Sequence, residues 1–320
     1  HGFEIVSPCG GNGTCGKCKV FLKDEGYVTS CNYTIENDIE IKLPDATESN
    51  ILSAQYERTK VLKLDPGNFE HFSPYPLGIA IDIGTTTIVF HLVHLLTGVL
   101  EKTHTRKNPQ GKYGADVISR INYCITRSDG LQVMQKEIIE TINSEILKFS
   151  NNSEFGPEDI VKISITGNTS MLHILMGENP EPLAFVPFTP VFTEEKIVKA
   201  STLKLPCNPE ATVQILPSFK AYIGADIVAG LASIQPDLKD KNYLFIDIGT
   251  NGEMALITPE KILACATAAG PAFEGANIEN GMAAVEGAIS VYQAPDRYNV
   301  IGGAKPTGIC GSGLIDIVAA

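Results

Sequence analysis

Residues 79–93 read IAIDIGTTTIVFHLV and residues 244–258 read LFIDIGTNGEMALIT, so the chain carries one pattern twice. Each copy consists of an apolar strand, the tetrapeptide Asp-Ile-Gly-Thr and a second apolar stretch that again suits a strand. Duplication of a whole domain explains such an internal repeat. The repeat therefore predicts two related lobes.

The residues around the first copy give the fold class. From Leu77 onward strands alternate with helices, with helices expected over 115–127 and 131–149 and strands over 160–166 and 213–216. The second helix carries apolar residues every three or four positions, which suits packing on a sheet. This alternation predicts an α/β fold for the main part of the chain.

The Asp-Ile-Gly-Thr turns have a chemistry that suits phosphate binding. An Asp at a strand end orients Mg²⁺ through water, and the Gly permits a tight hairpin. The backbone N–H groups and Thr hydroxyls of such a turn donate to phosphate oxygens. The alternative is a hairpin in which Asp and Gly are only good turn formers. Two copies, each after a strongly apolar strand, favour phosphate binding.

The paired motifs resemble those of the ATPase superfamily that includes acetate and sugar kinases, Hsp70 and actin, in which ATP and a metal bind between two ribonuclease-H-like lobes. The resemblance implies a first phosphate loop of Asp82, Gly84, Thr85 and Thr86, and a second of Asp247, Gly249, Thr250 and Asn251. It also implies a connecting helix over 223–231 whose Asp226 is a candidate catalytic acid. The adenosine-contacting motif is expected beyond Ala320.

Two of these features keep a second interpretation. Asp226 also suits an ordinary acidic residue at a helix N-terminus, where the helix dipole favours a negative charge. The stretch 166–170, Thr-Gly-Asn-Thr-Ser, ends a strand and opens a helix, so it either lines the nucleotide cleft or supplies a plain N-cap through Asn168 or Thr169.

The first 31 residues hold Cys9, Cys15, Cys18 and Cys31, four of the eight cysteines of the chain. Clustered thiolates favour a metal centre over disulfides, and a single CxxC disfavours structural zinc, which usually takes two CxxC pairs. Plant-type [2Fe-2S] loops have the spacing C-x4-C-x2-C, one residue shorter than this loop. The sequence therefore predicts an iron-sulfur cluster, most simply [2Fe-2S].

The segment from Cys9 to Cys31 resembles a ferredoxin-type domain, a small α+β fold of the β-grasp type that lacks its opening hairpin here. This organisation gives a ferredoxin-type domain over 1–64, a Pro-rich linker over 65–76, a first ATPase lobe over 77–235 and a second over 236–320. Because the chain starts at His1 and stops inside a helical pattern, we expect both end domains to be truncated.

Composition limits the partners. The 320-residue chain has a formal net charge of −12 and lacks a basic run, which argues against a nucleic-acid partner. It also lacks an apolar stretch near the roughly 20 residues of a transmembrane helix and a signal-peptide pattern. We expect no membrane partner and a cytoplasmic location.

The fusion of the two parts resembles the reductive activators of corrinoid proteins, and further stretches carry the likeness, namely 108–110, 113–120, 269–275 and 308–316. The resemblance implies that an upstream donor reduces the [2Fe-2S] cluster, and that ATP with Mg drives one electron onto a Co(II) corrinoid, restoring Co(I). Since the chain lacks DxHxxG, the corrinoid is expected on a partner, a corrinoid protein or a corrinoid methyltransferase subunit.

Other functions remain open. The chain also suits an electron-transfer or redox-sensing module with a nucleotide-binding domain, or a small-molecule kinase. A second cluster on the scattered Cys124, Cys207, Cys265 and Cys310 is disfavoured because these residues form no local pair. The apolar surroundings of His91, His94 and His173 suggest structural histidines rather than cobalt ligands.

Overall fold

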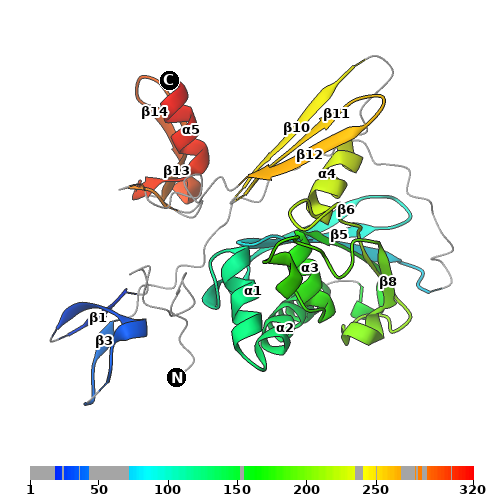
Figure 1. Cartoon of the computed structure of the whole chain (residues 1–320), viewed down its shortest axis with the longest axis horizontal. Coiled ribbons are helices and arrows are strands. Elements are labelled where there is room, and N and C mark those ends of the chain that lie inside the picture. Colours follow the sequence, from blue (N-terminus) through cyan, green and yellow to red (C-terminus); the bar gives the residue numbers. More distant parts are fainter. Residues whose placement is uncertain are drawn as a thin grey trace. The chain divides into compact units, whose positions relative to one another are not determined.

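The computed structural model describes residues 19–23, 25–35, 37–42, 72–151, 155–234, 241–249, 251–267, 278, 280–282, 287–303 and 305–320 (Figure 1). The chain divides into two compact units. The first contains the described residues up to Gly230, and the second contains those from Leu231 onward. No helix among the described residues is long and apolar enough to cross a membrane.

The N-terminal part of the first unit is a three-stranded antiparallel sheet in the order β2-β1-β3. Its elements are β1 (Lys19–Leu22), β2 (Gly26–Thr29), the 3-10 turn η1 (Ser30–Asn32) and β3 (Ile41–Lys42). This small sheet lies in the part of the chain expected to form the ferredoxin-type domain, and the β-grasp assignment stays a prediction.

The main sheet of the first unit has six strands in the order β6-β5-β4-β7-β9-β8. They are β4 (Leu77–Ile83), β5 (Thr87–His94), β6 (Leu100–Lys107), β7 (Ile160–Gly167), β8 (Lys196–Lys199) and β9 (Thr212–Ile215). Strands β4, β5 and β6 form an antiparallel meander, whereas β4, β7 and β9 run parallel. Parallel strands need helical crossovers, so this sheet confirms the expected α/β class.

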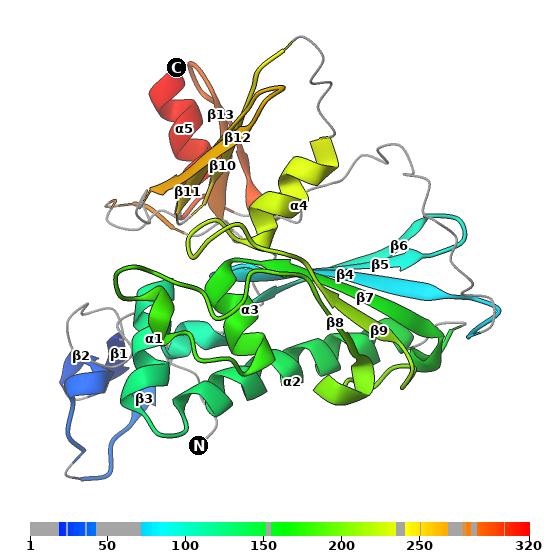
Figure 2. The same ribbon diagram turned by 45° about the vertical axis from the view of Figure 1, so that its right-hand side comes forward.

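Three helices lie on one side of this sheet (Figure 2). They are α1 (Val117–Thr126), α2 (Gly130–Ser150) and α3 (Thr169–Met176), and the helices expected over 115–127 and 131–149 are confirmed. The apolar stripe of α2, from Met134 to Ile146, is fully buried against the inward residues of the strands. Burial of each such side chain contributes about 1.5–3 kcal/mol, so the stripe anchors the layer.

The remaining elements of this unit are short. They are the 3-10 turns η3 (Pro109–Lys112), η4 (Pro157–Asp159), η5 (Glu181–Leu183) and η6 (Ala200–Leu203), and the helix α4 (Ala225–Ile234). The last of these matches the helix expected over 223–231, and the boundary between the two units falls inside it.

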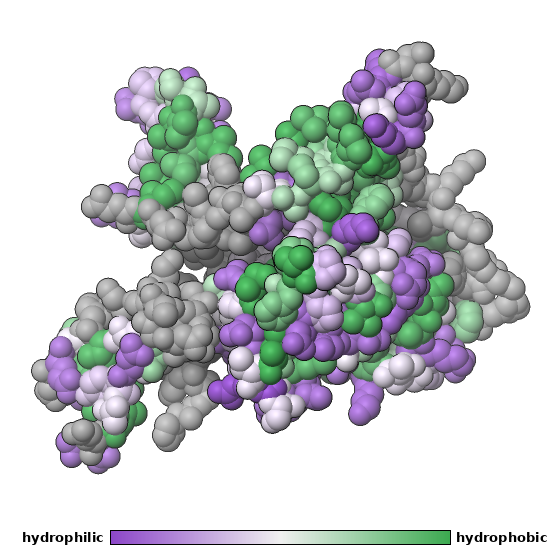
Figure 3. Space-filling model, in the orientation of Figure 1, coloured by the Kyte–Doolittle hydropathy of each residue, from purple (hydrophilic) through white to green (hydrophobic). Residues whose placement is uncertain are grey.

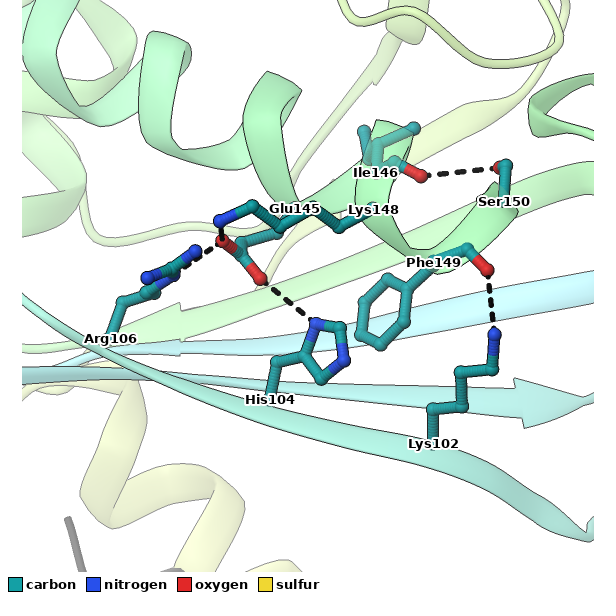
Figure 4. Close-up of polar contacts among 8 residues, drawn as sticks. All are labelled: Lys102, His104, Arg106, Glu145, Ile146, Lys148, Phe149 and Ser150. Atoms are coloured by element: carbon teal, nitrogen blue, oxygen red, sulfur yellow. Dashed lines mark hydrogen bonds and ion pairs between the residues drawn. The ribbon is translucent and has the colours of Figure 1, made fainter. Parts of the chain in front are cut away.

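A buried carboxylate fastens α2 to the edge strand β6 (Figure 4). The side chain of Glu145 is 2% exposed and accepts from His104 Nδ1 over 2.9 Å and Lys148 Nζ over 3.0 Å. Arg106 Nε is its third partner. Such a carboxylate is stable inside a protein only with partners of this kind, so the cluster holds the register between helix and strand.

The second unit begins with an antiparallel meander of β10 (Tyr243–Ile248), β11 (Gly252–Ile257) and β12 (Ile262–Thr267). It repeats the order of β4, β5 and β6, as the duplicated motif predicts. Its surface differs, because Leu244, Ile246 and Ile248 are 62%, 51% and 59% exposed. Figure 3 shows hydrophobic surface over this sheet.

A second small sheet follows in this unit, in the order β14-β13-β15. Its elements are β13 (Ala288–Gln293), β14 (Arg297–Val300), the turn η8 (Ile301–Gly303) and β15 (Gly308–Ile309), followed by helix α5 (Gly311–Ala319). The helix packs on β13, where Ser312 Oγ donates to Ser290 O over 2.7 Å. A Cβ on Gly313 would lie 2.2 Å from Ile289 O, so glycine permits this close approach.

Candidate functional site

The first Asp-Ile-Gly-Thr motif forms the turn between β4 and β5, here called the first turn (residues 84–87). Ile83 and Ile88 are the last paired residues before it. The N–H of Gly84 donates to Thr87 O over 3.0 Å and closes the turn. A Cβ on Gly84 would lie 2.7 Å from that oxygen. Any larger residue at this position therefore requires a backbone shift.

Three successive carbonyl groups of the first turn are bound by the protein. Asn108 Nδ2 donates to Gly84 O over 2.8 Å, and the Asn108 N–H donates to Thr86 O over 2.8 Å. Arg120 Nη2 donates to Thr85 O. In a planar trans peptide the N–H points opposite to the C=O. The N–H groups of Thr85 and Thr86 are therefore turned away from Asn108 and Arg120, and successive N–H groups presented in this way suit an anion.

Local sequence places both supporting side chains. Asn108 caps η3, where its Oδ1 accepts from Gln110 N over 3.0 Å, and it is 2% exposed. Asp116 caps α1 through a capping box with Ser119. The capping box sets where the helix begins, so that Arg120 reaches inward from its first turn.

Arg120 carries a buried charge. The residue is 1% exposed, and its Nε donates to Gly114 O over 2.9 Å while Nη1 lies 3.3 Å from Met171 Sδ. Among the described residues no carboxylate lies within ion-pair distance of it. Burial lowers the pKa of Arg120 to about 10, against the raising effect of Asp116, so the guanidinium is still protonated at neutral pH.

The end of β7 meets the first turn from the other side. Asn168 caps α3, with its Oδ1 accepting from Met171 N over 3.0 Å, and its Nδ2 donates to Thr85 Oγ1 over 3.1 Å. Gly167 has φ +153°, and a Cβ there would lie 2.6 Å from Ile83 O. Asn168 therefore supplies the expected N-cap and also contacts the first turn, whereas the lining of a nucleotide cleft by the stretch 166–170 stays a prediction.

Asp82 and Asp226 lie at this same edge of the sheet. Asp82 is in register with Thr166 on the parallel strand β7, and Thr166 Oγ1 is buried without a hydrogen-bond partner among the described residues. Asp226 is half-buried in the first turn of α4, and its Oδ1 accepts from Ile227 N over 2.8 Å. A Cβ on the neighbouring Gly224 would lie 2.8 Å from Gly167 O, so α4 begins against the end of β7.

The second motif forms the turn between β10 and β11, here called the second turn (residues 249–251). Its Gly249 N–H donates to Asn251 O over 2.9 Å, so the closing bond spans one residue fewer than in the first turn. Thr250 lies outside the described residues. Asp247 is exposed at the surface, yet neighbouring atoms partly desolvate its carboxyl group and raise its pKa.

Of the four cysteines expected to hold a cluster, Cys31 is described and Cys9, Cys15 and Cys18 lie outside the described residues. Cys31 lies half-buried in η1. Elsewhere in the described chain, burial raises the pKa of Cys124 and Cys207 to about 11, which disfavours their thiolates as ligands. No group of three or more His, Cys, Asp or Glu among the described residues is arranged to hold a metal.

The three histidines have structural partners, as expected. His91 Nδ1 lies 2.9 Å from Thr103 Oγ1, and His94 packs edge-on against Tyr75. His173 is completely buried, with Nδ1 2.7 Å from Thr169 O and Nε2 accepting from the N–H of Val191 over 3.0 Å. His173 thus uses both ring nitrogens within the core, as a neutral imidazole does.

The sequence did not predict that Asn108 and Arg120 support the first turn. Both lie in stretches that carried the family resemblance, but they are 24 and 35 positions from their partners Gly84 and Thr85. The available signals were local, an Asn before Pro-Gln and an Arg after a capping box. These signals predict where a helix starts, but they do not predict that the two side chains contact a distant turn.

Two family models match the chain. One describes the RACo middle region and matches residues 77–239, and the other describes the C-terminal ASKHA domain of RACo and matches residues 241–320. Together they cover both Asp-Ile-Gly-Thr turns and the residues that support the first.

Individual proteins are also similar. The corrinoid activation enzyme RamQ of Eubacterium limosum is 30% identical over 390 aligned positions, which cover 99% of this chain and 65% of RamQ. A Co(II) methylated amine-specific corrinoid protein reductase of Methanosarcina barkeri is 31% identical, covering 69% of this chain and 41% of the reductase. The solved structure of a reductive activator for a corrinoid, iron-sulfur protein matches with a TM-score of 0.70 and 30% identity, covering 98% of this chain and 67% of that one.

Proposed function

Because the chain belongs to the RACo family of reductive activators of corrinoid proteins, we propose that it drives an ATP-dependent one-electron reduction. The electron passes through a [2Fe-2S] cluster to the Co(II) corrinoid of a partner protein and restores Co(I). The observation that carries this proposal is the first turn, whose carbonyl groups are held by Asn108 and Arg120 so that its N–H groups are presented together. That arrangement suits the phosphates of ATP.

In this proposal the phosphates contact two loops. Asp82, Gly84, Thr85 and Thr86 form the first, and Asp247, Gly249, Thr250 and Asn251 form the second. The Asp side chains would hold Mg²⁺ through water, and the turn N–H groups and Thr hydroxyls would donate to phosphate oxygens. Asp226 acts as the catalytic acid at the edge where α4 meets β7.

Four thiolates would hold the cluster, those of Cys9, Cys15, Cys18 and Cys31. Supporting this, Lys19 directly follows Cys18 in the chain and pairs with Thr29, two residues before Cys31. The β1–β2 hairpin thus returns the chain toward Lys19, the residue next to Cys18. When bound, a plant-type cluster supplies one electron at about −400 mV.

ATP is proposed to supply free energy because the transfer runs uphill. For one electron, each gap of about 59 mV between donor and acceptor changes the equilibrium tenfold. A cobalt centre of lower potential than the cluster would therefore be reduced only in trace. Nucleotide binding or hydrolysis offsets this gap by favouring one conformation of the protein in its complex with the target.

The proposed partners follow from the same reaction. The acceptor is a corrinoid protein or a corrinoid methyltransferase subunit, and an upstream donor reduces the cluster. We place the protein in the cytoplasm, with no nucleic-acid partner given its net charge of −12. The domain limits 1–64, 65–76, 77–235 and 236–320 are part of this proposal.

The test uses full-length protein under anaerobic conditions, loaded with cluster and given a reductant and a Co(II) corrinoid protein. Absorbance of Co(I) should rise with ATP and stay near the baseline without it. Equal reduction with and without nucleotide would instead favour an electron-transfer module. A phosphorylated sugar or acid product would favour a kinase.

Matched variants locate the electron path and the catalytic acid. Cys31→Ser should abolish the cluster absorbance and Co(I) formation, whereas Cys265→Ser, at an exposed single cysteine, should preserve both. Asp226→Asn should lower the ATP-dependent rate by about 100-fold or more if the carboxylate transfers a proton. An unchanged rate in Asp226→Asn would leave Asp226 as an ordinary helix residue.

A further inference from the structure

The guanidinium of Arg120 is a buried cation that no described carboxylate approaches to ion-pair distance, and the favourable charge of Asp116 acts on it only from further away. Its three acceptors are two carbonyl oxygens, of Gly114 and Thr85, and the thioether of Met171. A buried charge is costly unless an opposite charge compensates it, and neutral acceptors compensate only part of that cost. The packing of Arg120 therefore calls for an anion close to the first turn.

The hydrogen bond from Arg120 to Thr85 O indicates on which face of the first turn an anion would bind. Arg120 contacts the inner face of the first turn through Thr85 O, while the N–H of the same peptide unit, that of Thr86, points to the opposite face. The guanidinium thus lies at the negative carbonyl end of this peptide dipole, and the positive N–H end points away from it. An anion on the outer face is attracted by both, and the low dielectric around a buried side chain screens that attraction less than water does.

The residues around Arg120 make this placement specific. A Cβ on Gly114 would lie 2.6 Å from Ser119 Oγ and 2.8 Å from Arg120 N, so glycine permits the loop to pass there and present its carbonyl to Nε. Asn108 and Asn168 hold the neighbouring groups of the same turn. These neutral amides position the backbone, and Arg120 alone adds a full charge.

We propose that Arg120 is a positioning residue of the first turn whose buried charge is neutralised by the polyphosphate chain of the bound nucleotide. This inference rests on the proposed function for the identity of the ligand. If it holds, the contribution of Arg120 to binding affinity grows with the negative charge of the ligand. A residue that only braces the turn would affect every ligand of the turn equally.

The experiment compares two substitutions in the full-length protein. Arg120→Gln keeps hydrogen-bonding groups and removes the charge. Arg120→Lys keeps the charge but loses the planar guanidinium group with its several N–H donors. Arg106→Gln is the control, because it removes a charge from β6 in the Glu145 cluster. Calorimetry gives the Kd of each protein for ATP, ADP and inorganic tripolyphosphate, and thermal unfolding reports whether each variant is folded.

The expected result is a loss that depends on ligand charge. Arg120→Gln should weaken ATP and tripolyphosphate by about tenfold or more and ADP by less, with Arg120→Lys within about threefold of the wild type. Arg106→Gln should leave all three affinities unchanged. Equal losses for all ligands in both Arg120 variants, or no loss in Arg120→Gln, would overturn the proposal.

The outcomes separate this inference from the proposed function. Charge-dependent binding without ATP-dependent Co(I) formation would keep the role of Arg120 and refute the reductase. ATP-dependent Co(I) formation in a protein whose ligand affinities do not change in Arg120→Gln would support the reductase and refute the role of Arg120. Wild-type protein that binds none of the three ligands would refute both.

Discussion

The two Asp-Ile-Gly-Thr hairpins share a sequence pattern and differ in how the rest of the protein supports them. Ile81, one position before Asp82, is 1% exposed, whereas its counterpart Ile246, one position before Asp247, is 51% exposed. The first turn is held by three carbonyl contacts and a hydroxyl contact. Among the described residues, the second turn is closed only by its own bond from Gly249 N to Asn251 O.

This difference separates two properties that the motif alone does not distinguish. The repeated pattern specifies a strand, a tight turn and a second strand, and both copies form them. Rigid support comes from residues outside the motif, namely Asn108, Arg120 and Asn168 at the first turn. A preorganised turn presents its N–H groups before the ligand arrives, which lowers the ordering cost of binding.

The largest expected effect comes from shortening the equivalent core positions. Ile81→Ala should lower the free energy of unfolding by about 2–5 kcal/mol, because it leaves a cavity beneath β4. Ile246→Ala should lower it by less than about 1 kcal/mol, because an exposed side chain loses little burial. Urea denaturation of the two variants beside the wild type measures both values.

Equal losses in the two variants would mean that Ile246 is as well packed as Ile81 in solution. The m value provides a check, since a change in m would indicate altered unfolding behaviour rather than a simple loss of stability.

The glycines of the two turns form a second matched pair. A Cβ on Gly84 would lie 2.7 Å from Thr87 O, whereas a Cβ on Gly249 would lie 3.5 Å from Asn251 O, an ordinary contact. Gly84→Ala should therefore destabilise the protein by about 1–3 kcal/mol through steric strain, and Gly249→Ala should be close to neutral. Thermal unfolding and ATP affinity should both follow this order. A larger defect in Gly249→Ala would reverse the assignment of the rigid turn.

The sequence predicted the parts that depend on local pattern. Apolar periodicity gave α2 and the strands β4, β7 and β9, and the repeated tetrapeptide gave both hairpins. The support of the first turn was not predictable in this way, because Arg120 reaches Thr85 through the packing of α1 and not through any spacing along the chain. Likewise, the apolar sequence of β10 resembles that of β4, yet β10 is largely exposed, since burial depends on what packs against a strand.

The smallest expected effect concerns the charge at the second turn. Partial desolvation raises the pKa of Asp247 above its usual 3.8, so the folded state holds this proton to a higher pH than the unfolded state does. The contribution of Asp247 to the free energy of unfolding therefore falls as the pH rises through the window from 3.8 to the raised value. At pH 7 the ionised carboxylate is thus slightly unfavourable, and Asp247→Asn should stabilise the protein by a few tenths of a kcal/mol, a small gain because the residue is exposed.

Urea denaturation at neutral and acidic pH measures this difference, with Glu260→Gln as the control, since it removes a charge from an exposed position in the connection between β11 and β12. The gain in Asp247→Asn should vanish below the usual pKa of an Asp, where both states are protonated. If Asp247 also orients the metal of the bound nucleotide, the same variant should lose ATP-dependent Co(I) formation while it gains stability. A loss of stability at pH 7 would contradict this account, because it would mean that the carboxylate has a favourable partner in the folded protein. The second turn would then be supported much as the first one is.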